Sequence, residues 1–269
     1  MMYRKMSVLI IAEKYSVAER ISYILSDGKA KRERKKNVPY FHFVKDGKNY
    51  FVIGLVGHVV ELDYPENYRS WNLDDLYELI NVNPIKVEKY KNLISVLKDL
   101  AKDAEMVIIA TDYDREGELI GKETLEILNF KGKVKRAKFS ALTKEEIIES
   151  FKNLTDLNEN LAGAAESRQN IDLVWGAVLT RFFSLISDQK WKDFLSVGRV
   201  QSPTLALIVD REKEIMNFKP EKYWEIEAKL ISENIEFNAS HEGNPFKEKP
   251  EKIYEKLKNE KKAFLLEKK

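Results

Sequence analysis

The chain has 269 residues, of which 43% are hydrophobic and 33% charged, and its formal net charge is +2. This composition is that of a globular protein long enough for more than one domain. No apolar run approaches membrane-spanning length, and the lack of cysteine excludes disulfides and thiolate metal sites and favours a cytosolic compartment. The small net charge gives no overall basic field, so a nucleic-acid partner has to be argued from local segments.

A buried strand is predicted over residues 7–12, because they form a short, nearly continuous apolar run. A helix follows, with Ser16 as the predicted N-cap and Glu19 at the third position of a capping box. Glu13 and Lys14 therefore lie at a strand-to-helix junction. A single acid in a loop is most simply a solvated one, so Glu13 gains importance only if a second strand also ends in acids.

The segment 29–36, Lys-Ala-Lys-Arg-Glu-Arg-Lys-Lys, is basic. It either tracks a phosphate backbone or forms a solvated loop, and the sequence leaves both open. Two strands are predicted at 41–44 and 50–56, around a turn at 46–47. His58 follows just before a strand-like segment, where a lone histidine is either structural or catalytic.

Acidic residues follow a second predicted strand. After irregular residues 64–84, with a short helix at 74–80, and an amphipathic helix at 87–101, an apolar run at 106–110 ends in Thr111. Asp112, Asp114 and Glu116 then occupy alternate positions and a helix begins. Residues two apart in extended chain point to the same side, so these carboxylates repel each other unless a cation lies among them. Hard oxygen ligands suit Mg²⁺, and α/β sheets place their active sites at the carboxyl ends of parallel strands.

The elements up to residue 155 predict one α/β domain. Its last members are a strand at 134–139, near a sheet edge because Lys and Arg alternate in it, and a helix opened by a capping box at Thr143. The domain is therefore placed at residues 1–155.

Residues 156–218 are predicted to form a helical domain. A wide apolar face marks a helix at 161–186, in which Arg168 and Asp172 are four residues apart and favour a simple ion pair. Ser202 is the predicted N-cap, and Pro203 the first residue, of a further helix. Arg199 and Gln201 stand just before that N-terminus, where main-chain N–H groups attract phosphate. Whether Arg199 contacts phosphate or pairs with an acid stays open.

Residues 219–269 predict a third, β-rich piece. Strands are expected at 223–230, 235–239 and 263–266, with a helix at 252–257. This piece is too short to bury a core of its own, so we interpret it as the beginning of a truncated domain.

Taken together, several stretches resemble the type IA DNA topoisomerases, in the archaeal-like form of topoisomerases I and III. Residues 11–18, Ile-Ala-Glu-Lys-Tyr-Ser-Val-Ala, are similar to the first Toprim motif, and residues 111–118, Thr-Asp-Tyr-Asp-Arg-Glu-Gly-Glu, to the second. Later family segments are matched in order at 57–58, 139–143, 166–172 and 198–205. The resemblance covers essentially the whole chain, and Toprim primases and nucleases lack the last two segments. It implies an α/β Toprim (Rossmann-like) domain, then an α-helical DNA-gate domain and the start of a β-rich arch domain.

The resemblance also implies a reaction and its residues. Single-stranded DNA would be broken, passed and rejoined without ATP through a 5′-phosphotyrosine intermediate. Glu13 would be the general acid–base for the 3′-oxygen, Lys14 would steady charge on the scissile phosphate, and His58 would support the site. Lys14 directly after Glu13 follows the topoisomerase III-like and archaeal form, whereas the bacterial topoisomerase I form carries its lysine at the position of Val17. Mg²⁺ would be held by Glu13, Asp112, Asp114 and Glu116. The DNA strand would be positioned by Arg115, Arg168, Asp172, Arg199, Gln201 and Ser202.

One departure from the family is the nucleophile. The family's Tyr-x-Arg-Thr-like segment does not occur, and Tyr113 belongs to the acidic motif. We therefore expect an N-terminal piece of a longer, cytoplasmic and nucleoid-associated enzyme, whose tyrosine lies beyond this chain and which acts on DNA and not at a membrane. A Toprim metal-dependent nuclease or primase, and a non-catalytic single-stranded DNA-binding module, are the alternatives.

Overall fold

The computed structural model describes residues 7–189, 193–232, 234–241, 243–258, 260 and 262. Two compact units divide the chain, Met1–Pro203 and Thr204–Lys269. No helix in the described ranges is long and apolar enough to cross a membrane. The strand predicted at 263–266 falls outside the described residues.

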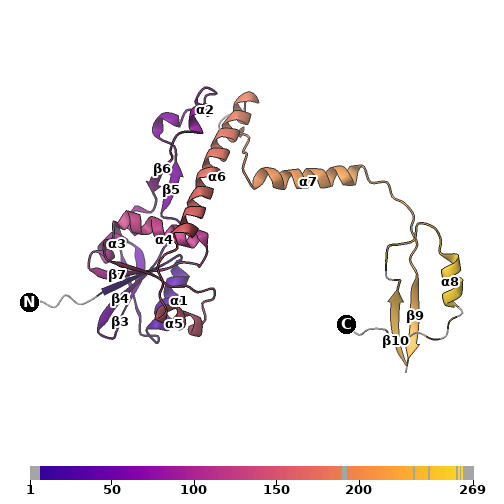
Figure 1. Cartoon of the computed structure of the whole chain (residues 1–269), viewed down its shortest axis with the longest axis horizontal. Coiled ribbons are helices and arrows are strands. Elements are labelled where there is room, and N and C mark those ends of the chain that lie inside the picture. The colour runs from indigo at the N-terminus through magenta and orange to yellow at the C-terminus, as the bar shows by residue number, and fades with distance from the viewer. Residues whose placement is uncertain are drawn as a thin grey trace, which may run out of the picture. The chain divides into compact units, whose positions relative to one another are not determined.

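A mixed six-stranded sheet forms the centre of the first unit, in the order β2-β3-β4-β1-β7-β8 (Figure 1). The central strands β4, β1, β7 and β8 run parallel, whereas β2 and β3 extend the sheet as an antiparallel ribbon. The predicted turn between β3 and β4 is confirmed, with Asp46 and Gly47 at φ 50° and 75°, as a tight two-residue hairpin requires. The strands are β1 Ser7–Ala12, β2 Lys31–Lys35, β3 Val38–Lys45, β4 Lys48–Gly54, β7 Ala104–Ala110 and β8 Lys133–Arg136.

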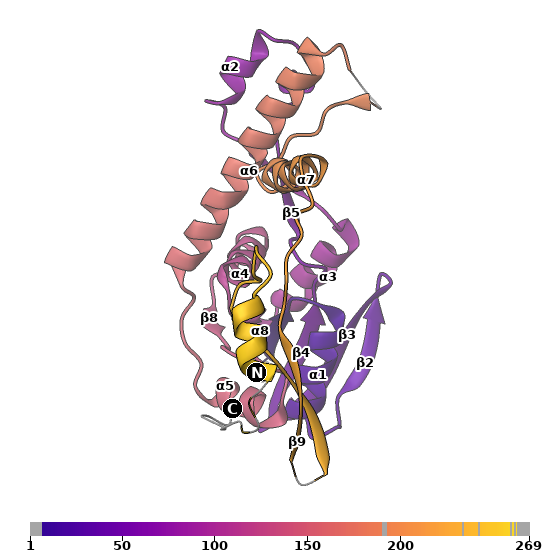
Figure 2. The same cartoon turned by 90° about the vertical axis from the view of Figure 1, so that its right-hand side faces the viewer.

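Two pairs of helices cover the two faces of the sheet (Figure 2). On one face, α1 Tyr15–Leu25 and α5 Lys144–Lys152 pack on alternate residues of β1, among them Val8 and Ile10. On the other face, α3 Lys91–Ala101 and α4 Arg115–Leu128 pack on Leu9 and Ile11. Because β1 is buried on both faces, it reads as the continuous apolar run from which it was predicted.

A smaller core lies in an extension of the sheet. This extension is a two-stranded antiparallel ribbon, β5 Val60–Asp63 and β6 Ile85–Glu88, together with η1 Glu66–Tyr68 and α2 Asp75–Leu79. The long helix α6 Glu159–Ile186 runs beside this extension (Figure 1). Tyr64 and Leu79 are buried there against Leu173 and Val178 of α6. The helix is thereby fixed at one end to α4 and at the other to α2.

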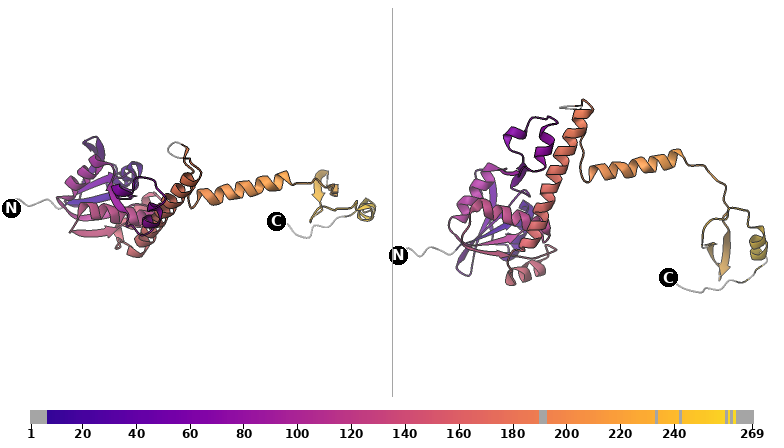
Figure 3. Two further views of the ribbon diagram at one scale, coloured as in Figure 1. Left: turned by 90° about the horizontal axis from the view of Figure 1, so that it is seen from above. Right: turned by 45° about the horizontal axis from the view of Figure 1, so that its top comes forward.

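Helix α7 Gln201–Met216 begins in the first unit, and the second unit also holds an antiparallel hairpin. Strands β9 Glu227–Ser232 and β10 Ile235–Ser240 pair with Ile235 opposite Ser232. Helix α8 Glu251–Lys258 lies beside the hairpin (Figure 3). The predicted hairpin and helix are confirmed, and the predicted domain limits at 155 and 218 stay a prediction.

Three local predictions were wrong. The first helix begins at Tyr15 with Lys14, not Ser16, as its N-cap, because an isolated bridge between Lys14 and Val56 holds the main chain extended until that point. The helix predicted from residue 87 begins at Lys91, since Ile85–Glu88 pairs with β5. Helix α7 starts at Gln201, so Ser202 is not its N-cap and Pro203 is its third residue, where a proline is still tolerated because first-turn N–H groups have no helical partner.

The basic run at 29–36 is not a loop. Residues Lys31–Lys35 form the edge strand β2, paired to β3 with Glu33 opposite Tyr40. Charged side chains on an edge strand discourage pairing with another chain, which accounts for this composition without a ligand.

Candidate metal and nucleic-acid site

Glu13 and Asp112 meet at the carboxyl ends of two adjacent parallel strands. Ala12 of β1 pairs with Ala110 of β7, and the main-chain N–H of Asp112 donates to Oε2 of Glu13 at 3.3 Å. After β1 the chain continues toward β4, and after β7 toward β8, so the strand order reverses between these two strands. Such a reversal is where open α/β sheets bind ligands.

Lys14 presents its side chain to solvent beside Glu13. Its Nζ lies 3.6 Å from Oε1 of Glu13, and the lysine side chain is 62% exposed whereas that of Glu13 is 15% exposed. A long cationic side chain with this freedom can reach an anion bound above the strand ends.

The acidic loop between β7 and α4 is held by its own polar groups. Asp114 is the N-cap of α4, and its side chain accepts a hydrogen bond from the N–H of Gly117 at 2.7 Å. The buried hydroxyl of Thr111 donates to the carbonyl of Gly117 at 2.7 Å. A Cβ at Gly117 would lie 2.0 Å from the carbonyl oxygen of Asp112, so the loop can close only on glycine.

Arg136, the last residue of β8, also holds this loop in place, although it was not predicted as a site residue from the sequence. Its guanidinium donates to the carbonyls of Thr111 and Asp112 at 2.9 and 2.8 Å and to Glu118 at 2.7 Å. Arg136 and Glu118 have no exposed side-chain surface. The available signal was Glu118 itself, a carboxylate beside the apolar residues Leu119 and Ile120 of a helix.

Glu116 is turned toward α6 and His58. It accepts from Arg168 at 2.9 Å and lies 3.5 Å from Nε2 of His58. Nδ1 of His58 lies 2.8 Å from the buried carboxylate of Glu123, and this hydrogen bond is the main reason that the pKa of His58 is raised. Gln169 also contacts the imidazole, at 3.2 Å. Neither Glu123 nor Gln169 was predicted.

Asp172 lies between two arginines. Nε of Arg168 lies 3.6 Å from Oδ2 of Asp172, as the four-residue spacing predicted. Arg199 donates two hydrogen bonds to the same carboxylate, one from Nε to Oδ1 and one from Nη2 to Oδ2 at 3.2 Å. The hydrogen bond from Arg199 is the first cause that holds the pKa of the Asp172 carboxyl below its usual range. Arg199 therefore pairs with an acid in this structure, one of the two readings left open by the sequence.

Three predicted DNA-binding residues remain: Gln201, Ser202 and Arg115. Gln201 accepts from the Ser196 hydroxyl at 3.0 Å, and the N–H of Ser202 donates to the Gly198 carbonyl at 3.1 Å. The half-exposed Arg115 side chain stands 4.0 Å from Glu116.

The donor set fits a hard cation in chemistry and in place, but its side chains are not gathered. Glu13, Asp112 and Asp114 offer carboxylate oxygens on adjacent strand ends, which suits Mg²⁺. Across the described residues, however, no three His, Asp or Glu side chains are close enough together to hold a metal ion. The reason is visible at Glu116, which is engaged by Arg168, and at Asp114, which caps α4.

Comparison with known proteins decides the family. The Toprim domain family matches residues 8–142, and the DNA topoisomerase family matches residues 156–268. The chain belongs to the type IA DNA topoisomerase family. Curated DNA topoisomerase 1 proteins from Thermoplasma acidophilum and Archaeoglobus fulgidus are both 48% identical to this topoisomerase chain, over 93% and 94% of its length. The matches span 33% and 38% of those relatives, so the chain covers roughly a third of their length.

A solved structure agrees with the fold. Full-length topoisomerase I from Thermotoga maritima superimposes on 92% of this chain and 37% of its own, with a TM-score of 0.58 and 26% identity. The predicted family and fold class, an α/β Toprim domain followed by helices and strands, are confirmed. Toprim domains of topoisomerases are metal-dependent, and the family acts on DNA.

Proposed function

We propose that this chain supplies the metal- and DNA-holding part of a type IA topoisomerase that breaks, passes and rejoins single-stranded DNA without ATP. The observation that carries the proposal is the meeting of Glu13 and Asp112 at the point where the strand order reverses. Family membership supports it, and the whole enzyme would act through a 5′-phosphotyrosine intermediate.

Glu13 and Lys14 would serve the bond-breaking step. As a tyrosine oxygen attacks phosphorus and its hydroxyl proton passes to water, the bond to the 3′-oxygen breaks. Glu13 gives that leaving oxygen a proton and takes it back on rejoining, when the tyrosine regains its proton from water. Lys14, exposed beside Glu13, would offset the negative charge that builds on the phosphate oxygens. His58 would support the site through its contact with Glu116, whose carboxylate lies 3.5 Å from Nε2.

Mg²⁺ would be held by Glu13, Asp112, Asp114 and Glu116, and when bound it would neutralise phosphate charge during rejoining. Glu116 has to leave Arg168 to join this set. A released Arg168 would then be available to a phosphate, so that metal binding and DNA binding favour one another.

The DNA strand would be positioned by Arg115, Arg168, Asp172, Arg199, Gln201 and Ser202. Asp172 contacts both Arg168 and Arg199, so a single carboxylate orients the two guanidinium groups. We further propose that the nucleophilic tyrosine comes from a part of the enzyme not represented in this chain, because the chain covers roughly a third of its relatives and contains no Tyr-x-Arg-Thr-like segment.

Calorimetry tests the metal site. Wild-type chain is titrated with Mg²⁺ beside Asp112→Asn and the control Asp156→Asn, an exposed acid paired with Lys135. Because even outer partners of metal ligands cost roughly 10- to 100-fold in affinity, Asp112→Asn should weaken binding by at least about tenfold and the control should not. Equal affinity in all three proteins would count against the assigned ligands.

A second experiment separates the candidate activities. A labelled single-stranded DNA oligonucleotide is incubated with the chain and Mg²⁺, and the reaction is stopped with SDS. We expect intact, unattached DNA. Label on the protein would show a nucleophile within this chain, and shortened DNA without an adduct would favour a Toprim nuclease.

A further inference from the structure

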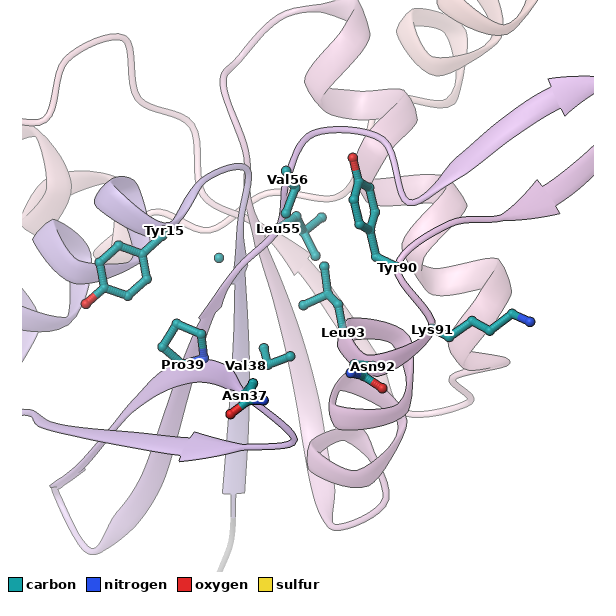
Figure 4. A pocket seen from close by; sticks show the side chains of 11 residues that line it. Tyr15, Asn37, Val38, Pro39, Leu55, Val56, Tyr90, Lys91, Asn92 and Leu93 are labelled. Carbon is teal, nitrogen blue, oxygen red and sulfur yellow. The ribbon is translucent and has the colours of Figure 1, made fainter.

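An apolar cavity opens beside the strand ends that carry Glu13 and Lys14. It has a volume of about 560 Å³ and lies between the start of β3, the end of β4 and the start of α3. Figure 4 shows Tyr15 and Tyr90 on opposite sides of it, with Leu55 and Leu93 between them. We call it the base pocket.

The base pocket shares a wall with the candidate site. The N–H of Leu55 donates to the carbonyl of Ala12 at 2.8 Å, and that of Gly57 to the carbonyl of Glu13 at 3.2 Å. Gly54 makes this approach possible, since a Cβ there would lie 2.6 Å from the main chain of Lys14. The segment that lines the pocket is therefore bonded to the main chain of Ala12 and Glu13, although the side chains of Glu13 and Lys14 do not line the pocket themselves.

The lining combines an apolar floor with polar edges. Leu55 and Leu93 are 2% and 5% exposed and form the floor. Asn37 and Asn92 offer amide donors and acceptors at the rim, the groups that recognise the edges of a flat heterocycle. A volume of this size is typical of sites for small organic molecules.

Tyr90 stands on the rim in a conformation that local structure does not require. It is 44% exposed and has φ 52°, in the left-handed region, at the N-cap of α3, where its side chain makes no capping bond. A tyrosine gains nothing from that position as a cap, whereas its ring offers a stacking surface to a ligand.

Cations border the base pocket, and carboxylates lie one contact further out: the Tyr15 hydroxyl donates to Glu19 at 3.3 Å, and Lys14 lies 3.6 Å from Glu13. Lys91 lines it, Lys14 adjoins it, and the Arg32 guanidinium lies 5.4 Å from the centre of the Tyr15 ring. No carboxylate is among the described residues that line it. An aromatic surface bordered by cations is the combination with which proteins hold single-stranded nucleic acid.

We propose that the base pocket takes one unstacked base of single-stranded DNA, with Tyr90 as the stacking partner, and so sets which phosphate lies over Glu13. This inference rests on the proposed function. An apolar protein segment is the competing occupant, but the cationic rim and the amide groups favour a base over it.

Binding of a labelled oligothymidylate of about 12 nucleotides, within the site sizes of such proteins, is measured by fluorescence anisotropy over a range of salt concentrations. Tyr90→Asn removes the ring, and asparagine tolerates the left-handed conformation, so the fold is kept. Affinity should fall roughly fivefold to a hundredfold without a change in salt dependence, and Tyr90→Phe should restore it. The matched control is Tyr77→Asn, because Tyr77 is 78% exposed and lies on α2, away from the pocket.

Equal effects of Tyr90→Asn and Tyr77→Asn, or failure of Tyr90→Phe to restore binding, would overturn the inference. So would a wild-type chain that binds Mg²⁺ in the calorimeter but no oligonucleotide, although the metal part of the proposed function would then stand. Photo-crosslinking with 5-iodouracil in the oligonucleotide gives an independent readout. A crosslink on the peptide with Tyr90 supports the pocket, and crosslinks only elsewhere contradict it.

Discussion

Nε of Arg136 lies 2.7 Å from a carboxylate oxygen of Glu118, and both side chains are wholly buried. The second oxygen of Glu118 accepts from the N–H of Asn158 at 3.1 Å, and Asn158 is the N-cap of α6. Since Arg136 also holds the carbonyls of Thr111 and Asp112, one ion pair ties the acidic loop to the helix that carries Arg168.

Replacing Arg136 by methionine should destabilise the chain by about 3–5 kcal/mol, because it leaves Glu118 buried and unpaired. The matched control is Lys135→Met, which breaks the pair with Asp156, 82% exposed, and should cost less than about 1 kcal/mol. Urea unfolding followed by circular dichroism measures both. A cost for Arg136→Met as small as that of the control would show that the pair does not hold the fold.

Gly117→Ala should cost about 3 kcal/mol or more, since the new Cβ would lie 2.0 Å from the Asp112 carbonyl oxygen and the main chain must shift. Gly163→Ala in α6 meets no atom within 4 Å, and alanine there should stabilise the chain by roughly 0.5–1 kcal/mol. Thermal unfolding compares the two substitutions. If both had the same sign, the closeness of the acidic loop to α4 would be in doubt.

Much of the sheet and part of the candidate site follow from local pattern. Residues 7–12 and 107–110 of the two apolar runs are buried on both faces, and the residues that follow them meet because parallel neighbouring strands end together. The predicted N-cap at Thr143 is confirmed, with its hydroxyl accepting from the N–H of Glu146 at 3.3 Å, but the capping box is not completed, because the Glu146 side chain accepts from the N–H of Ser140 instead. Each of these depends on residues a few positions apart.

The rest depends on tertiary contacts that a local pattern does not contain. A strand was predicted at 134–139, near a sheet edge. Strand β8 does form an edge, but it ends at Arg136, which is buried because Thr155 pairs with its main chain at 2.8 Å and Glu118 pairs with its side chain. Glu116 reads as a metal ligand in sequence, but its partner Arg168 lies 52 residues away. The helix predicted at 87–101 begins only at Lys91, with Tyr90 as its N-cap, because residues 85–88 pair with β5 as strand β6.

Arg199→Gln tests phosphate contact in the proposed function. On a single strand each neutralised phosphate contributes about 0.7 to the slope of log affinity against log salt concentration. The substitution should therefore reduce the slope for a single-stranded oligonucleotide by about 0.7. Arg69→Gln is the control. Arg69 is 62% exposed and likewise pairs with acids, Asp63 and Glu66, but it is not among the predicted DNA-binding residues. An unchanged slope for Arg199→Gln would restrict Arg199 to its pair with Asp172.

Glu166 gives α6 a pH-dependent attachment to α4 and β6. It lies 3.0 Å from Lys122 and 3.1 Å from Lys86, and the hydrogen bond from Lys122, then that from Lys86, holds its pKa below the ordinary value of 4.5. The pKa values of both lysines are raised, in agreement. A depressed carboxyl pKa contributes stability above the ordinary value and loses it as the pH falls through the lowered one. Glu166→Gln should thus cost about 1 kcal/mol at pH 7, and its difference from wild type should shrink below about pH 4.5. Urea unfolding at pH 7, 5 and 3 measures this, and a difference constant over that range would mean that the charge of Glu166 contributes nothing.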